Sequence, residues 1–392
     1  MDVQVLSPEV IQDTQPTGIE SIHPDAIATT FSSDCIGTPP PPNSLPYPLC
    51  IPPPYLKLSL LTHPADLASS GLSSRILSTS DEWFAPATSL LSPTLPIRRP
   101  GVYVHSGAWY DGWETRRHNP EPYDWVIVRL GVASGTVSGV EIDTAFFDGN
   151  HAPEVSVEGC FLPGREEADA RVVERGWGGW EQLLPRVECG ASRRHAWRVQ
   201  ESGRAYTHVR LCMYPDGGIA RFRLYGSAVP VWPEDREAVV ELSAAVMGGL
   251  AVSCSDQHFG RKDNLLLPGR GVDMGDGWET KRTRGKGHVD WVIVKLGARG
   301  VVDSLVVDTA HFRGNFPQAV RVEGIDAEGE TPAADDARWV EVLGVQKLGS
   351  DLEHSYGKAE LSNVDGKAYT HMKMIIIPDG GVKRFRVFGR KA

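Results

Sequence analysis

One short segment, DGWETRRHN from Asp111 to Asn119, gathers the side chains that acid–base chemistry on a small anion requires. Five ionisable residues stand within eight positions: Asp111, Glu114, Arg116, Arg117 and His118. Carboxylates and imidazoles can transfer protons, and the planar guanidinium of arginine can hold a carboxylate through two parallel hydrogen bonds. The segment therefore gathers residue types that can transfer protons and bind an anion. The alternative is a solvated loop that follows an Asp-Gly turn.

The segment occurs twice in the chain. DGWETKRTRGKG begins at Asp276, 276 − 111 = 165 residues later, and supplies Glu279 and Arg282 at matching positions. Two further strings return in the same order: DTAFFDGNHAP as DTAHFRGNFPQ, and YPDGGIARFRLYG as IPDGGVKRFRVFG. A period of this length indicates duplicated domains, because solenoid and propeller repeats span only tens of residues.

The two DTA strings differ in the position of their histidine. The first repeat has Phe146 and His151 where the second has His311 and Phe316. Histidine can give and take protons near neutral pH, so both histidines are candidates for acid–base work. If they serve one chemistry, either the two pockets differ or residues of both repeats converge on one composite site. The alternative is that each histidine packs at the base of a loop.

Two more histidines, His208 and His371, precede the PDGG strings on predicted strands. Apolar and polar side chains alternate along residues 208–213, which places the histidine on the face opposite the apolar one. Each histidine is expected either to face a pocket or to be exposed to solvent.

Structural roles are expected for two other repeated pairs. Trp113 and Trp278 are predicted to be anchored in the core, because tryptophan is usually largely buried. Asp143 and Asp308 stand at matched strand ends, where we expect them to tie a turn or orient an arginine.

Short apolar runs closed by Gly, Pro, Asp or Asn predict an all-β fold. In the first repeat the expected strands cover residues 125–130, 137–142, 154–157, 209–213 and 222–225. The PDGG strings are strong turn signals between two strands. Long periodic helices are missing, so each repeat is predicted to be an antiparallel sandwich of jelly-roll type.

The domain organisation follows from the repeat and from composition. Residues 1–55 are rich in Pro, Ser and Thr and predict a disordered tail. Repeat 1 is expected to cover residues 56–228 and repeat 2 residues 245–392. Residues 229–244 are the expected linker between them. A stretch within residues 230–249 could form a short helix.

These repeated strings resemble the allantoicase family closely, and the resemblance covers nearly all of residues 67–390. It implies two tandem jelly-roll domains of the galactose-binding, discoidin-like type. It also implies the hydrolysis of allantoate to (S)-ureidoglycolate and urea, a step of allantoin degradation in purine catabolism for nitrogen use. The enzyme class would be a hydrolase acting on C–N bonds in linear amidines.

Allantoate is a carboxylate whose carbon bears two ureido groups, so a site must hold the carboxylate, orient the ureido arms and protonate the departing urea. The candidates for proton transfer are His151, His311, Glu114 and Glu279. The candidates for substrate binding are Asp111, Arg116, Arg117, His118, Asp276, Arg282, Arg313, His208 and His371. Among these, Arg117 and Arg282 are the expected partners of the carboxylate.

Composition narrows the remaining choices. A formal net charge of −10 argues against nucleic acid or an anionic membrane surface as the main partner. The six cysteines show no CxxC spacing, which favours free thiols in a reducing compartment. The sequence shows neither an apolar run long enough to span a membrane nor a secretory signal, so a soluble cytoplasmic protein is expected.

The expected partner is the small-molecule substrate allantoate, and the chain is expected to be a homo-oligomer. No metal motif is present and no cofactor is expected, although oxygens of Ser80, Asp81, Ser255 and Asp256 could ligate a structural divalent cation. Two rival readings remain: a non-catalytic, lectin-like binding module, and a degenerate paralogue that keeps the scaffold without activity.

Overall fold

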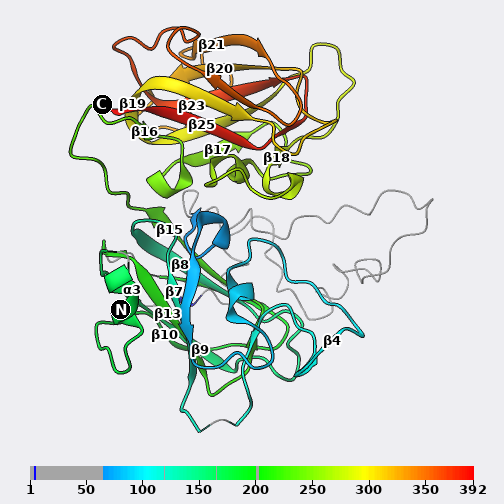
Figure 1. Cartoon of the computed structure of the whole chain (residues 1–392), viewed down its shortest axis with the longest axis vertical. Coiled ribbons are helices and arrows are strands. Elements are labelled where there is room, and N and C mark those ends of the chain that lie inside the picture. Colours follow the sequence, from blue (N-terminus) through cyan, green and yellow to red (C-terminus); the bar gives the residue numbers. More distant parts are fainter. Residues whose placement is uncertain (1–3, 6–64, 119, 165, 200–202) are drawn as a thin grey trace. The chain divides into compact units, whose positions relative to one another are not determined.

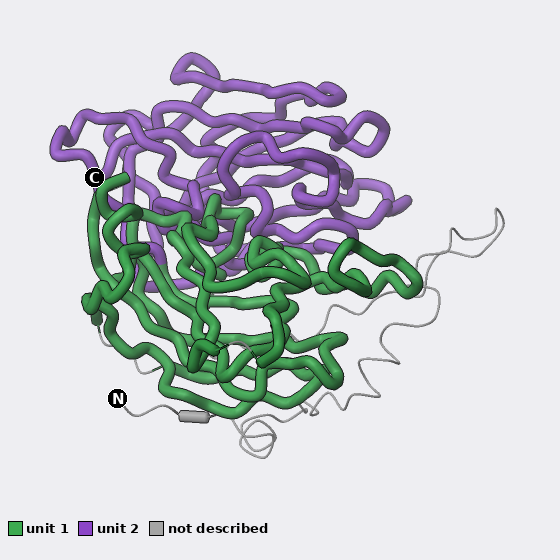
Figure 2. Tube along the Cα trace, turned by 60° about the horizontal axis from the view of Figure 1, so that its bottom comes forward, with its two compact units in different colours: residues 1–227 green, residues 228–392 purple. Residues whose placement is uncertain are grey.

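The computed structural model describes residues 4–5, 65–118, 120–164, 166–199 and 203–392 (Figure 1). These residues belong to two compact units, Met1–Ser227 and Ala228–Ala392 (Figure 2). The predicted tail lies outside the described residues except for Gln4–Val5, which form strand β1 and pair with Trp197 and Arg198.

Unit 1 consists of two antiparallel sheets. The first has the spatial order β10 (Glu181–Glu188), β9 (Glu154–Cys160), β13 (His208–Tyr214), β7 (Asp124–Arg129) and β3 (Arg75–Thr79). The second has the order β1 (Gln4–Val5), β11 (Arg194–Arg198), β8 (Gly135–Asp143), β15 (Arg221–Ala228) and β2 (Ala65–Asp66), with β12 (Ala205–Tyr206) also on β8. The described part of the unit also contains two small pairs: β4 (Tyr103–Val104) with β5 (Gly107–Ala108), and β6 (Trp113–Glu114) with β14 (Gly218–Ile219).

Unit 2 repeats this arrangement with one long strand in place of two. Strand β19 (Asp290–Asp308) occupies the positions of both β7 and β8. Its pairing register with β23 shifts between Lys295 and Gly300. Its order of strands is β16 (Val240–Glu241), β25 (Arg384–Lys391), β19, β23 (Ala368–Ile377), β20 (Ala319–Ile325) and β21 (Val340–Lys347), with β17 (Leu250–Cys254) and β22 (Glu353–Tyr356) also on β19. A small pair, β18 (Trp278–Glu279) with β24 (Gly381–Val382), matches β6 with β14. The predicted fold, two tandem jelly-roll sandwiches of the galactose-binding, discoidin-like type, is confirmed.

The helices of the described residues are short. They are α3 (Glu166–Val172) and the 3₁₀ turns η3 (Ser70–Leu72), η4 (Ala87–Leu91), η5 (Ala245–Met247), η6 (Lys262–Leu266) and η7 (Met274–Asp276). The helix considered within residues 230–249 is reduced to the single turn η5, while Val240 and Glu241 pair with β25 of unit 2.

The core of each unit contains the predicted tryptophan anchor. Trp113 and Trp278 are fully buried, and each indole Nε1 donates to a backbone oxygen, that of Asp81 at 2.7 Å and that of Asp256 at 2.8 Å. Burial of an indole ring stabilises the fold by about 4 to 6 kcal/mol, and the satisfied N–H removes the main cost of burying it. The anchor fixes β6 and β18, in which Glu114 and Glu279 directly follow the tryptophans.

The turn after β13 and β23 depends on a glycine that an aromatic ring covers. A Cβ added at Gly218 would lie 2.1 Å from the ring of Phe147, and one added at Gly381 would lie 2.0 Å from that of Phe312. The PDGG strings therefore form tight turns at one end of each sandwich, as predicted.

The cysteines and the helices of the described part of the chain bear on two further expectations. Cys160, Cys189, Cys212 and Cys254 are free thiols, whereas Cys35 and Cys50 lie outside it. No helix among the described residues is long and apolar enough to cross a membrane.

Candidate functional site

Three backbone segments meet beside the PDGG turn of unit 1. Glu114 on β6 pairs with Gly218 on β14 and, on its other side, forms a bridge with Ala85. His151 forms a parallel bridge with the same Gly218. The small sheet therefore places Glu114 and His151 on either side of one glycine, although they come from different sequence blocks.

The carboxylate of Glu114 is held by an asparagine. Asn150 Nδ2 donates to Glu114 Oε1 at 2.6 Å. In unit 2, Asn315 Nδ2 donates to Glu279 Oε1 at 2.5 Å. The two asparagines were not among the predicted site residues, although both stand in the repeated GN dipeptide of the DTA strings.

The two glutamates differ in their surroundings. Glu114 is only 7% exposed, whereas Glu279 is partly exposed. Burial raises the pKa of Glu114, and the hydrogen bond from Asn150 and the charge of Arg117 offset part of that increase. A raised pKa makes the ionised Glu114 a stronger base.

Each repeat ties an arginine to the aspartate of the PDGG turn. Arg117 donates from Nη1 to Asp216 Oδ1 at 2.7 Å and from Nη2 to the oxygen of Gly149 at 2.9 Å. Arg282 makes the same two contacts, with Asp379 at 3.1 Å and with the oxygen of Gly314 at 3.0 Å.

Both aspartates are nearly fully buried, and the arginine side chains are 39% and 56% exposed. The backbone N–H of His118 donates to the second oxygen of Asp216, so this predicted binding residue also takes part in the turn. Asp216 and Asp379 were not predicted as site residues either.

The swapped histidines lie in different surroundings. His151 follows Asn150 and is partly exposed, and its Nδ1 atom is enclosed without a hydrogen-bond partner among the described residues. His311 has a positive φ of 70°, and its backbone N–H donates to Asp351 at 2.7 Å. The structure thus places His151 in the β-bridge with Gly218, beside the Glu114–Asn150 pair. Among the described residues, His311 forms no bridge of this kind.

The residues that replace these histidines are apolar and packed. Phe316 takes the place of His151 and packs against the core of unit 2. Phe146 takes the place of His311 and packs against a small cluster that includes Phe147 and Ala220. Unit 2 has the fully buried Lys383 in place of Ala220, and burial lowers the pKa of its ammonium to about 8.

Asp111 and Asp276 are held by buried arginines. Arg221 donates from Nη2 to Asp111 Oδ2 at 2.8 Å, and Arg384 does so to Asp276 Oδ2 at 3.1 Å. The same guanidiniums donate to the oxygens of Thr94 and Gly269, which places these two residues at equivalent positions. These aspartates fix loops at the end of the sandwich.

Two predicted binding arginines lie on the surface. Arg116 donates from Nε to Asp81 Oδ1 at 3.1 Å, and its guanidinium lies over the ring of Trp83. Arg313 is 80% exposed and pairs with Asp351 at 3.3 Å.

The structure does not bring His208 and His371 into either cluster. Each stands near the start of its strand, and His208 precedes Tyr214 by six positions, so it lies about 20 Å from the PDGG turn. Both are buried, so the prediction of solvent-exposed strand histidines is wrong. Helix α3 covers His208, whose Nε2 lies 2.9 Å from Asp169 Oδ1. Burial lowers the pKa of His208, and lowers that of His371 to about 4.

The oxygens considered for a cation already have partners. Ser80 Oγ donates to Asp124 and Ser255 Oγ to Asp290, both at 2.7 Å. Asp81 accepts from the backbone of Arg116, and Asp256 from that of Lys281. Within the described ranges, no three His, Cys, Asp or Glu side chains are grouped so that they could hold a metal ion.

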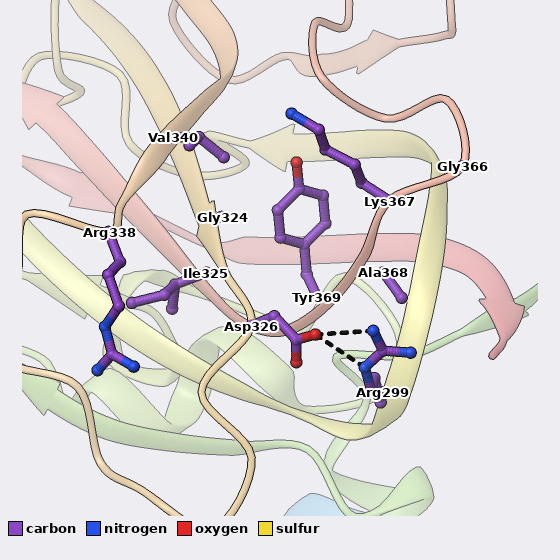
Figure 3. A pocket seen from close by; sticks show the side chains of 10 residues that line it. All are labelled: Arg299, Gly324, Ile325, Asp326, Arg338, Val340, Gly366, Lys367, Ala368 and Tyr369. Carbon is purple, nitrogen blue, oxygen red and sulfur yellow. Dashed lines mark hydrogen bonds and ion pairs between the residues drawn. The ribbon is translucent and has the colours of Figure 1, made fainter.

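A cavity of about 400 Å³ lies in unit 2 at the start of β23, the strand end opposite the PDGG turn (Figure 3). Its lining includes Tyr369, Lys367 and the ion pair of Arg299 with Asp326, which the dashed lines mark. None of the predicted site residues lines it.

Comparison with known proteins identifies the repeats. A family model described as the allantoicase repeat matches residues 65–229 and 240–392. The chain is 60% identical to an allantoicase of Neurospora crassa over 330 residues, which cover 83% of this chain and 91% of that protein. It is 50% identical to an allantoicase of Saccharomyces cerevisiae, with 83% of this chain and 93% of that protein covered.

A solved structure agrees with these relatives. The crystal structure of the Saccharomyces cerevisiae allantoicase matches with a TM-score of 0.71 and 47% sequence identity. The match covers 83% of this chain and 93% of that one, so both units take part in it.

Proposed function

The chain belongs to the allantoicase family, and we infer from this membership that it is a hydrolase that cleaves allantoate to (S)-ureidoglycolate and urea. The observation that carries the inference is the 60% identity to the Neurospora crassa allantoicase over nearly the whole of both repeats. Fold alone would leave a lectin-like binding module open. Identity at this level to allantoicases disfavours that reading, and turnover would exclude a degenerate paralogue.

The reaction sets the chemistry that the site must perform. One C–N bond at the central carbon breaks, and a water oxygen forms a new bond to the same carbon. The water proton must leave, and the departing nitrogen must gain a proton to become the second amino group of urea. One base and one acid on opposite sides of the carbon meet both requirements.

In unit 1 we assign the base to Glu114 and the acid to His151. They flank Gly218 in the small sheet, which separates them while keeping both beside the same turn. The raised pKa of Glu114 suits proton abstraction from water. His151 is partly exposed, and its imidazole can donate a proton to the departing urea nitrogen.

The carboxylate of the substrate is assigned to Arg117. Its contacts with Asp216 and Gly149 use two of the five guanidinium N–H groups, and the side chain is 39% exposed, so further N–H groups are open to a ligand. The aspartate holds the guanidinium in one orientation before substrate arrives. Arg282, held by Asp379, has the same relationship to unit 2.

The remaining predicted residues take supporting roles in this proposal. Asp111 and Asp276 shape the loops through Arg221 and Arg384. Arg116 and His118 lie at the exposed margin of the site in unit 1, where they can contact the outer ureido arm, and Arg313 lies on the surface of unit 2. His208 and His371 are too far along their strands to contact substrate at the turn, so we no longer assign them a binding role.

We further propose that the protein acts in the cytoplasm, that it assembles as a homo-oligomer, and that it requires no cofactor. The partner is the small molecule allantoate, and neither nucleic acid nor a membrane surface is involved.

The experiment that tests the function is incubation of the purified protein with allantoate, followed by measurement of urea and ureidoglycolate with and without a chelator. Equimolar products in both conditions are expected. Absence of both products would contradict the proposed activity, and loss of activity with chelator alone would contradict cofactor independence.

A further inference from the structure

Unit 2 retains the polar scaffold of the site in unit 1. Asn315 holds Glu279, Arg282 joins Asp379 to Gly314, and the N–H of Gly381 donates to the oxygen of Asn315 at 2.7 Å. The turn glycine is again covered by an aromatic ring, that of Phe312. The Glu–Asn, Arg–Asp and Arg–Gly hydrogen bonds of the two units thus match one for one.

Unit 2 lacks the acid of unit 1. Phe316 stands where unit 1 has His151, and it packs against the core instead of presenting a proton. The nearby Glu82, which accepts from the N–H of Ala87, is replaced by Gln257, which makes the matching contact with the N–H of Lys262. Unit 2 keeps the groups that hold a ligand and loses an ionisable group at each of these two positions.

The retained groups suit a ureido group next to a carboxylate. A ureido group presents N–H donors beside one carbonyl acceptor. The oxygens of Glu279 and the carbonyl of Asn315 can accept those N–H groups, and the free N–H groups of Arg282 can bind a carboxylate. Glu279 and Asn315 are partly exposed and Arg282 is 56% exposed, so a ligand can reach all three.

We propose that the cluster Glu279, Asn315 and Arg282 is a second binding site, which takes ureido-bearing carboxylates without hydrolysing them. The proposal rests on the proposed function, because that function supplies the ligand class. It makes unit 2 a binding domain and unit 1 the domain that performs the reaction.

The test uses the full chain and N-carbamoylglycine, a carboxylate with a single ureido arm, in equilibrium dialysis. The wild-type chain should bind about two molecules. Glu279→Ala should weaken one of the two binding events by about tenfold or more, the loss expected for charge-assisted hydrogen bonds. Lys358→Ala is the control: Lys358 is an exposed cation of unit 2 that pairs with Asp303 outside the cluster, and its loss should leave both events unchanged.

Two results would overturn the proposal: a single binding event in the wild-type chain, or two events that Glu279→Ala leaves unchanged in a variant whose circular dichroism matches the wild type. If Glu279→Ala fails to fold, Arg282→Gln gives the same comparison. The failure of this proposal differs from the failure of the proposed function, because a chain that releases urea from allantoate yet binds one N-carbamoylglycine overturns only the second site.

Discussion

Asn150 donates its side-chain amide to Glu114 across 36 positions of sequence, at 2.6 Å. This hydrogen bond favours the ionised carboxylate and therefore opposes the increase in pKa that burial causes. The contact couples the DTA string to the DGWET string and sets how basic Glu114 is. It also offers a direct way to change that basicity without touching the carboxylate.

We predict that Asn150→Ala raises the pKa of Glu114 further, because the buried carboxylate loses a donor. If ionised Glu114 is the base, activity falls as pH drops through its pKa, so the acid limb of the kcat/KM profile should move to higher pH. Asn315→Ala is the matched change in unit 2 and should leave that limb in place. An unmoved limb in a folded Asn150→Ala variant would remove Glu114 from the role of base.

We predict that Arg117→Lys raises KM for allantoate by about tenfold or more, because lysine keeps the charge but loses the fork that holds a carboxylate. The loss of stability should stay below about 1 kcal/mol, since the ion pair is partly exposed. Arg186→Lys, a change in an exposed pair with Glu154, is the control. Steady-state kinetics with unaltered kcat/KM would move carboxylate recognition to another group, such as Arg313 or the PDGG turn amides.

Asp143 and Asp308 occupy matched positions in the two repeats, and the difference between their surroundings predicts a pH dependence of stability. Asp308 accepts two hydrogen bonds from Arg270, at 2.7 and 2.9 Å. The residue of unit 1 that is equivalent to Arg270 is Leu95, since Thr94 and Gly269, which precede them, accept equivalent hydrogen bonds from Arg221 and Arg384. Asp143 therefore lacks the arginine that Asp308 has at this position.

Burial raises the pKa of Asp143 to about 6. The folded state therefore binds this proton more tightly than the unfolded state. The stabilisation is complete below about pH 3.8 and is lost as pH rises through about 6.

We expect Asp143→Asn to abolish this part of the pH dependence, on the order of 3 kcal/mol from the shift in pKa. The asparagine oxygen can still accept the N–H of Ala145. Asp308→Asn removes the ion pair with Arg270 and one of its two hydrogen bonds, and should instead destabilise the protein at pH 7. Denaturant unfolding from pH 4 to 7 measures both variants, and parallel curves for wild type and Asp143→Asn would contradict the prediction.

We predict that a chain starting at Leu56 folds and melts as the full chain does, because a Pro-rich segment without apolar periodicity buries too little surface to offset its ordering entropy. The only described strand that such a truncation removes is β1, two residues paired with β11. Calorimetry on the two chains gives the answer. A melting temperature several degrees lower in the shorter chain would show that the removed residues belong to the core.

The sequence predicted the fold well because the repeat and the short alternating runs carry local information. The strand predicted at residues 209–213 is β13, and the turn after it is where the PDGG string indicated. Burial of His208 could not be predicted, because the residue that covers it, Asp169, belongs to the seven-residue helix α3, which is too short to show a period.

The site was predicted in part for the same reason. Glu114, Arg117 and His151 belong to conspicuous strings and could be named from their chemistry. Asn150 and Asp216 could not be, because their roles depend on long-range pairing that only the folded chain displays. The duplication is the sequence signal that could have found them, since both residues are repeated in unit 2.

The most direct test of the account is the rate of urea release by His151→Asn and His311→Asn at saturating allantoate. Our assignment of the acid to His151 predicts a loss in kcat of about 100-fold or more for His151→Asn, the usual scale for a general acid. His311→Asn should show a much smaller loss, or one confined to KM, because His311 does not belong to the bridge beside a Glu–Asn pair. Equal, partial losses in the two folded variants would indicate an independent active site in each repeat, and near-full activity in His151→Asn would contradict the account altogether.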